Sequence, residues 1–212
     1  MINDSGILNA TSLAFCVLGA VTLVQLFRGW RSFVDTSFTR ADAQLASQLA
    51  IFVVPPLYIL AHEFGHYSVA HAVGAEEVQL HDRVFWGFCT FNYRPDIVSR
   101  WNVLEILAAG PLVQLALGCL TLAAGVAIRS RGVWRYLLSV VGLYQIVFAL
   151  VLYPLIDFAT GWHNDFGQIY VTNLTHEEAL FVAIGHAAVV VILLSVIKHP
   201  AVATALRRPN IA

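Results

Sequence analysis

Charged side chains are scarce in this sequence. Asp, Glu, Lys and Arg together make up 12% of its 212 residues, whereas soluble chains contain nearer a quarter. Hydrophobic residues make up 58% of the chain, and its mean hydropathy is +0.73. Apolar runs of about 20 residues, the length that crosses a bilayer as a helix, recur from one end to the other. These features exclude an ordinary soluble domain and predict an all-α polytopic membrane protein.

Other absences narrow the possibilities further. The three cysteines, Cys16, Cys89 and Cys119, are scattered and odd in number, so they predict neither a disulfide framework nor a CxxC metal site. The formal net charge of -1 offers no basic surface for a nucleic-acid partner. The first residues lack the basic region of a cleavable signal peptide, so we expect the first apolar run to stay as an anchor. We find no internal repeat, low-complexity segment or soluble second domain.

The apolar runs predict five transmembrane helices, at about residues 8–27, 44–73, 103–128, 133–156 and 179–197. Thr39 or Asp42 is the expected N-cap of the second helix. Pro55 and Pro56 should kink that helix, because each proline removes a backbone donor.

Residues 76–95 differ from the spans on either side. They are rich in Val, Phe, Trp and Tyr, too polar to cross a bilayer, and contain a turn candidate at His81-Asp82-Arg83. This pattern predicts a short β-hairpin-like element at the membrane surface, between helices two and three. An aromatic loop at the interface is the alternative.

The positive charges predict an orientation. Nine of the 12 Lys and Arg residues lie in the connections after the first, third and fifth spans: Arg28, Arg31, Arg40, Arg129, Arg131, Arg135, Lys198, Arg207 and Arg208. The positive-inside rule therefore places the N-terminus outside and the C-terminus inside.

The second span carries the strongest functional motif, the HExxH formed by His62, Glu63 and His66. On a helix this spacing puts two imidazoles one turn apart on the same face, where both can bind one zinc ion with Glu63 beside them as general base. Ionisable groups inside a membrane-length apolar run are costly and indicate function. The alternative is a helix end whose His and Glu only meet interfacial water.

A catalytic zinc site needs a third protein ligand. The best source is the polar segment after Pro154, which contains Asp157, His163 and Asp165 and falls on the same side of the membrane as the HExxH. His71, Glu105 and His186 are weaker candidates, since none has a ligand spacing relative to the motif.

The chain resembles the site-2 protease family of intramembrane zinc metalloproteases over roughly residues 45–170. The matching features, in order, are HEFGH in an apolar helix, an aromatic hairpin, an Ala-Gly-Pro span, and a later span ending in proline and an Asp-containing, glycine-rich segment. The resemblance implies that Asp165 is the third ligand, with Asp157 and then His163 as alternatives. It also implies a substrate-positioning role for Gln114, where the family usually has Asn after Gly-Pro; the alternative is a polar contact between helices at a proline kink. The family's LDG-like motif is interrupted here, because Phe166 separates Asp165 from Gly167.

The chain is accordingly identified as a small, divergent member without accessory domains. Residues 1–43 would form an anchor and basic loop, residues 44–170 the metalloprotease core, and residues 171–212 a last helix and basic tail. The expected activity is hydrolysis of a peptide bond in or near the transmembrane segment of a membrane protein, with Zn2+ as cofactor, Glu63 as catalytic base, and the inner membrane of a prokaryotic cell as location.

Two other functions remain open at this point. A Ste24-like membrane zinc protease would take Glu177 or Glu178 as third ligand. A non-catalytic metal-binding or scaffold protein would keep the fold without turnover.

Overall fold

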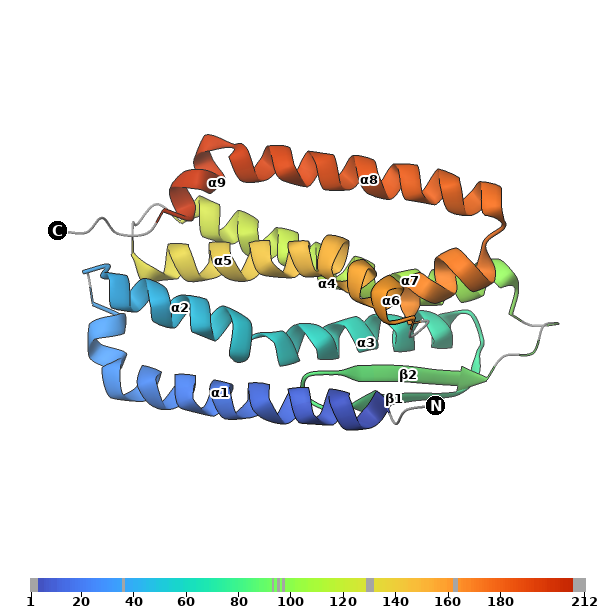
Figure 1. Ribbon diagram of the computed structural model, residues 1–212, viewed down its shortest axis with the longest axis horizontal. Coiled ribbons are helices and arrows are strands. Elements are labelled where there is room, and N and C mark those ends of the chain that lie inside the picture. Colours follow the sequence, from blue (N-terminus) through green and yellow to red (C-terminus); the bar gives the residue numbers. More distant parts are fainter. Residues whose placement is uncertain are drawn as a thin grey trace.

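The computed structural model of the chain describes residues 4–35, 37–92, 94, 96, 98–128, 132–161 and 164–207. Most of these residues are helical, and the long helices lie side by side along one axis (Figure 1). Five helical segments in this part of the chain are long and apolar enough to cross a membrane: Asn9–Phe33, Arg40–Ala72, Arg100–Ala127, Val133–Thr160 and His176–Lys198. They overlap the five predicted spans, so the predicted number and order of long apolar helices are confirmed.

The first two spans are joined by a capped turn. Helix α1 (Asp4–Phe33) runs six residues beyond its predicted end at Phe27, because arginines such as Arg28 and Arg31 are good helix formers and do not stop a helix. Thr39 caps α2 (Arg40–Phe52) in a capping box, in which its hydroxyl accepts from the Asp42 backbone N–H and the Asp42 carboxylate accepts from that of Thr39. The expected N-cap is therefore confirmed.

The proline pair divides the second span. Helix α2 ends at Phe52, and α3 (Pro55–Ala72) starts afresh with the prolines in its first turn, where their missing donors cost little. This break is the predicted kink, and it makes α3 a separate rod that carries the HExxH.

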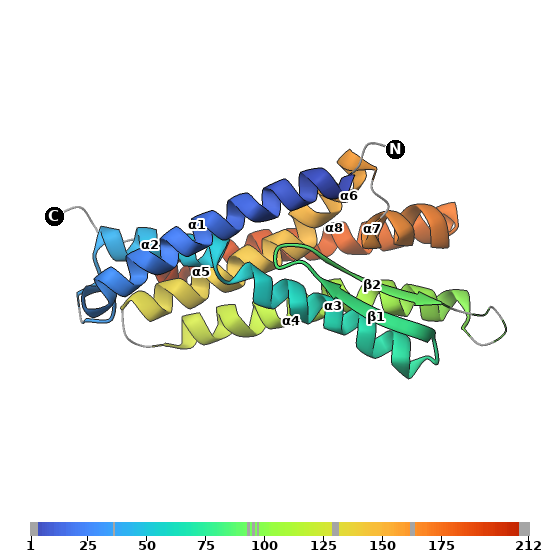
Figure 2. The same ribbon diagram turned by 90° about the horizontal axis from the view of Figure 1, so that it is seen from below.

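Residues 76–92 form the predicted hairpin, with strand β1 (Glu76–Asp82) antiparallel to β2 (Gly87–Asn92) and Leu80 opposite Cys89. The turn comes later than expected: β1 continues through Asp82, and Val84 sits in the turn with a φ of 71°. Figure 2 shows the hairpin running along α3, against which both strands pack. Helix α1 holds the turn, because the Ser12 hydroxyl donates to the Arg83 carbonyl at 3.2 Å and Phe15 contacts Phe85.

Helix α4 (Arg100–Ala127) packs closely against both α3 and α5 (Val133–Val147). Small residues allow the approach: a Cβ on Gly142 of α5 would lie 2.3 Å from the backbone nitrogen of Leu122 on α4. Such glycine contacts are typical of helix pairs in membranes.

The chain after α5 is irregular. A π-helical turn, η1 (Phe148–Leu152), leads into α6 (Tyr153–Thr160), which ends at Gly161 with a φ of 66°. A single turn, α7 (Asp165–Gly167), and a second π-helical turn, η2 (Gln168–Asn173), then precede the last long helix α8 (His176–Lys198) and the short α9 (Pro200–Ala205). Predictions that fall on His163, Arg129, Arg131 and Arg208 lie outside the described residues.

Several buried apolar clusters hold the helices together, and two of them join helices that are distant in sequence. One joins α1, α2 and α5, and the other joins α4, α5, α8 and α9. The metal-ligand candidates lie outside both, where α3, α4 and α7 meet (Figure 1).

Candidate metal centre

His62 and His66 lie on the same face of α3, buried against α4. Their exposed fractions are 6% and 4%, and their Nε2 atoms are 3.0 Å apart. Gly65, between them in sequence, faces α4 so closely that a Cβ would lie 2.8 Å from the Ala109 carbonyl oxygen. The glycine of HEFGH is thus what lets the motif helix rest on the backbone of α4.

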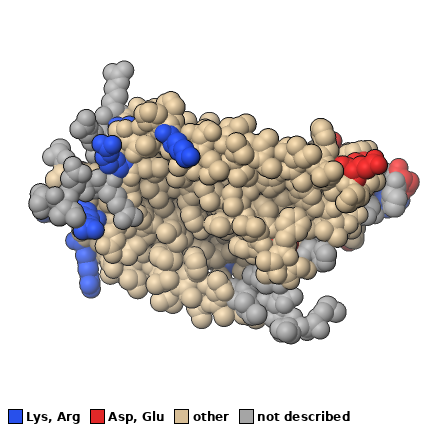
Figure 3. Space-filling model, turned by 45° about the horizontal axis from the view of Figure 1, so that its top comes forward, with Lys and Arg blue, Asp and Glu red and all other residues tan. Residues whose placement is uncertain are grey.

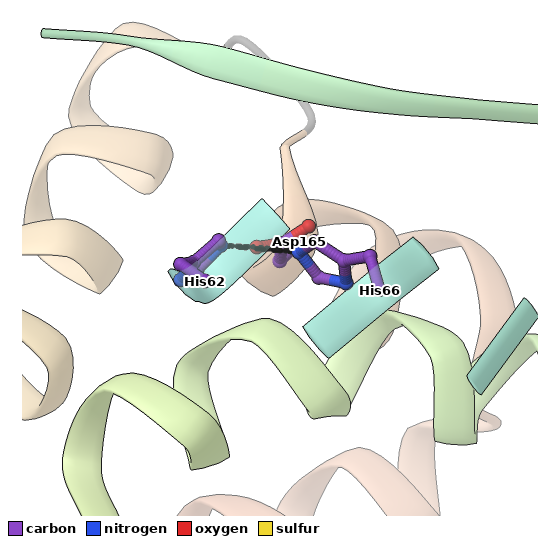
Figure 4. Close-up of side chains that lie close together, drawn as sticks. All are labelled: His62, His66 and Asp165. Atoms are coloured by element: carbon purple, nitrogen blue, oxygen red, sulfur yellow. Dashed lines mark hydrogen bonds and ion pairs between the residues drawn. The ribbon is translucent and has the colours of Figure 1, made fainter. Parts of the chain in front are cut away.

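The Asp165 side chain reaches the two imidazoles from the start of α7. Its Oδ2 atom lies 3.0 Å from His62 Nε2 and 3.2 Å from His66 Nε2, and Figure 4 shows the three side chains pointing toward one another. Ligands that share one tetrahedral zinc at about 2.0–2.1 Å stand ~3.3 Å apart. The spacing of the three atoms therefore fits a single ion.

Both imidazoles are oriented by a partner on their other nitrogen. His66 Nδ1 donates to the Ile106 carbonyl oxygen at 2.6 Å, and His62 Nδ1 lies 3.2 Å from Gln114 Oε1. With the proton on Nδ1, each Nε2 presents a lone pair to the point where Asp165 also presents an oxygen. Two lone pairs and a carboxylate in one buried place are a donor set suited to a divalent cation such as zinc.

The Asp165 carboxylate is itself held in place. Tyr153, at the start of α6, donates its hydroxyl to Oδ2 at 3.0 Å. Burial alone would raise the pKa of Asp165. When His62 and His66 also carry a proton on Nε2, as they can without metal, their hydrogen bonds and positive charge outweigh burial and hold the pKa well below its usual range. The group is therefore a carboxylate, the form that binds metal.

Asp157 contacts the backbone of the loop that carries Asp165. Its two oxygens accept from the backbone N–H groups of Asn164 at 2.8 Å and Gly167 at 2.7 Å, on the two sides of Asp165. The side chain is 1% exposed and fixes the turn that presents Asp165. Of the three predicted third-ligand candidates, the structure brings Asp165 to the histidines, places Asp157 behind it, and does not describe His163.

Glu63 lies beneath the hairpin, next to the histidines in sequence. It is 6% exposed, and its Oε2 atom has no hydrogen-bond partner among the described residues. Gly87, the first residue of β2, is so near that a Cβ would lie 2.8 Å from Glu63 Cγ. The hairpin thus covers a buried carboxylate that is left free to accept a proton.

Gln114 makes the polar contact between helices that the sequence analysis gave as one of its two roles. It is 3% exposed, and it contacts His62 through Oε1 and Gln145 through Nε2. In this arrangement it orients His62, and its role toward a substrate stays a prediction.

The other candidates from the sequence lie elsewhere. His71 is exposed and meets the Tyr67 ring edge-to-face, and Glu105 accepts a hydrogen bond from Asn102. His186 contacts Tyr170 and donates to the Leu150 carbonyl oxygen at 2.8 Å. Glu178, proposed for the Ste24-like alternative, caps α8 and pairs with Arg100 at 2.8 Å. No local pattern pointed to Tyr153 or Gln145, since each acts through a side-chain contact with another element.

Comparisons of the chain with protein-family models, with curated proteins and with solved structures give no match.

Proposed function

We propose that the protein is a membrane-embedded zinc metalloendopeptidase, which hydrolyses a peptide bond in or near a transmembrane segment of its substrate. One observation carries the proposal: His62, His66 and Asp165 converge in a buried place beside the free carboxylate of Glu63. An ion held only as a structural element would not need an unpartnered acid next to it, whereas a hydrolase needs a base there.

The distribution of charge supports insertion in a bilayer. In Figure 3, Lys and Arg gather at one end of the long axis and Asp and Glu at the other, and the face between them shows little charge. The cationic end is formed by the end of α1, the starts of α2 and α5, and the end of α8, with Arg31, Arg40, Arg135 and Lys198. This polarity is consistent with a multi-pass protein whose C-terminus faces the cytoplasm, and we propose a prokaryotic inner membrane as its location.

In the proposed reaction, zinc would supply a Lewis acid that polarises the scissile carbonyl and acidifies the attacking water. His62, His66 and Asp165 would hold the ion from one side. Glu63 would accept the proton of the attacking water and return it to the leaving nitrogen. Burial of the site beneath the hairpin would keep bulk water out and strengthen each of these electrostatic contacts.

The hairpin offers a way to present the substrate. The carbonyls of a transmembrane helix are already hydrogen-bonded, so a cleavable segment must be held extended. Among the described residues β1 and β2 form a sheet of these two strands only, and an extended segment could add to this sheet as a further strand. Since Gly87 of β2 abuts Glu63, a segment bound along this hairpin would run close to the proposed base.

The test compares Glu63→Gln with the parent and with Glu105→Gln, a matched change at an exposed carboxylate on α4. Cells that express each form would be analysed for new N-termini in membrane proteins, and each purified form for zinc. We expect cleavage products with the parent and Glu105→Gln, none with Glu63→Gln, and zinc in all three. Products that persist with Glu63→Gln would refute the assigned base. Zinc in every form, without any Glu63-dependent product, would favour the scaffold function.

A further inference from the structure

Gln145 is among the most buried side chains of the protein. It lies on α5, is 1% exposed, and accepts a hydrogen bond from Gln114 Nε2 at 2.8 Å through its Oε1 atom. Gln114, on α4, in turn directs its own Oε1 to His62 Nδ1. Three helices thus contribute one side chain each to a hydrogen-bonded chain that ends at His62, a metal-ligand candidate.

The close packing of α4 and α5 makes this hydrogen-bonded chain possible. A Cβ on Gly118 of α4 would lie 3.3 Å from Gln145 Cβ, and a Cβ on Gly142 of α5 would lie 2.7 Å from the Gly118 carbonyl oxygen. With larger residues at these crossings the helices would stand farther apart, and the two amides would separate.

Stability alone does not account for a glutamine at position 145. Its Nε2 atom is buried and has no hydrogen-bond partner in the described part of the chain. A buried donor without a partner is destabilising, and an apolar side chain of the same shape would avoid that cost. The polar group therefore needs an explanation other than packing.

The amide of Gln114 can point either way, and only one way suits a metal ligand. With Oε1 toward His62, the proton stays on Nδ1 and Nε2 is free to bind metal. With the NH2 group toward His62, Nδ1 would have to accept and the proton would move to Nε2. The Gln145 carbonyl oxygen favours the first orientation, because it accepts from the NH2 group on the opposite side.

We propose that Gln145 is a positioning residue of the metal centre: its Oε1 fixes the Gln114 amide, which holds His62 in the tautomer that binds metal through Nε2. This inference rests on the metal centre of the proposed function and deepens it. Gln145 touches neither metal nor substrate, so its effect must appear in metal affinity.

The test measures the zinc dissociation constant, by competition with a chromogenic chelator, and the unfolding midpoint of the metal-free protein. Gln145→Met keeps the shape and removes the acceptor, whereas Gln145→Glu keeps an acceptor oxygen. Ser139→Ala is the matched control, since Ser139 is also a fully buried, unpartnered polar residue of α5 but has no contact with Gln114 or His62.

We expect Gln145→Met to raise the zinc dissociation constant about tenfold, as removal of an outer-shell partner does, while the metal-free midpoint stays the same or rises. Gln145→Glu and Ser139→Ala should bind zinc like the parent. Gln114→Met should weaken zinc binding by itself. Adding Gln145→Met to it should weaken zinc binding no further, because both changes interrupt the same hydrogen-bonded chain.

Equal zinc affinity in Gln145→Met and Ser139→Ala would overturn the proposal, as would full additivity with Gln114→Met. A Gln145→Met protein that is less stable without metal, and no weaker in zinc affinity, would assign Gln145 to packing alone. Failure of the parent itself to bind zinc would refute the metal centre, and is distinguishable from both of these results.

Discussion

The backbone of Gly110 on α4 lies directly against the imidazole of His66 on α3. A Cβ built on Gly110 would stand 2.3 Å from His66 Nε2 and 2.7 Å from His62 Cδ2. The Nε2 edges of both rings therefore rest on a position that has room for hydrogen only.

Gly110→Ala should abolish zinc binding. The added methyl group would occupy the space of the ligand atoms, and we expect zinc affinity to fall at least about 100-fold, the upper range for perturbing a metal site through its surroundings. Gly185→Ala is the control, since nothing lies within 4 Å of a Cβ on Gly185. Zinc content after dialysis against a weak chelator measures both, and retention of zinc by Gly110→Ala would contradict this geometry.

Much of the fold could be predicted from local sequence. The apolar runs gave the order of the long helices, Thr39 gave the start of α2, and the proline pair gave its end, because hydropathy, capping and missing donors act within a few residues. The HExxH spacing likewise placed His62 and His66 on one face. The polar segment that interrupts an apolar run just after Pro154 pointed to Asp157, His163 and Asp165 together, and the family resemblance favoured Asp165 among them.

The rest of the site depends on contacts between distant segments. Three residues take part in the site only because α3, α4, α5 and α7 approach one another closely: Gly110, Tyr153 through its hydroxyl and Gln145 through its amide. No local pattern encodes how closely these helices approach. Both roles of Gln114 were left open for the same reason: the sequence shows an amide within the span, but not whether it points to another helix or to a substrate.

Tyr153→Phe should weaken zinc binding without unfolding the protein. The change removes the hydrogen bond to Asp165 Oδ2 and keeps the ring packed against Phe166. We expect the zinc dissociation constant to rise about tenfold, measured by chelator competition. Tyr144→Phe, on the preceding helix α5, should bind zinc like the parent. Equal effects of the two changes would argue against a specific role for the Tyr153 hydroxyl.

Substitution of Asp165 should affect zinc binding, whereas substitution of Asp157 should affect the stability of the protein. Asp165→Asn removes the ligand charge and should abolish zinc binding. Asp157→Asn removes an acceptor for Asn164 or Gly167, and should lower the free energy of unfolding of the metal-free protein by about 1–3 kcal/mol. Thermal unfolding and zinc content of the two variants check this. An Asp157→Asn protein of unchanged stability that has lost zinc would instead make Asp157 the ligand.

Gly87→Ala should impair turnover and spare metal binding. The new methyl group would displace Glu63, from whose Cγ it would lie 2.8 Å, while the ligands sit on other elements. A shift of the base by about 1 Å can cost on the order of 100-fold in rate. Processing of whichever protein depends on Glu63 measures the effect, with Thr90→Ala on the outward face of β2 as control. Unchanged processing would mean that the hairpin does not constrain Glu63.

Cys89 should react slowly with alkylating agents at neutral pH. Its partial burial, and then the negative charges of Glu63 and Asp165, raise the pKa of the thiol to about 11. Because only the thiolate reacts, the rate with iodoacetamide should keep rising about tenfold per pH unit past pH 9, where an ordinary thiol with a pKa of about 8.5 levels off. The measurement uses a protein with Cys16 and Cys119 replaced by alanine. A rate that levels off below pH 9 would contradict the covered position of Cys89.

The π-helical turn η1 loosens the tie between the length of an apolar helix and the geometry of the site. A π-turn holds one more residue than the α-helical turn it replaces, so the extra residue is taken up locally and the helix beyond it keeps its direction. Losing one of Phe148–Leu152 would let this turn close as an α-helix and leave Tyr153 and Asp165 facing His62. Losing a residue from a regular α-helical turn would instead rotate everything that follows by about 100°. Among sequences that share this motif and this aspartate, the number of residues between them can therefore differ by one at this turn while the site is kept.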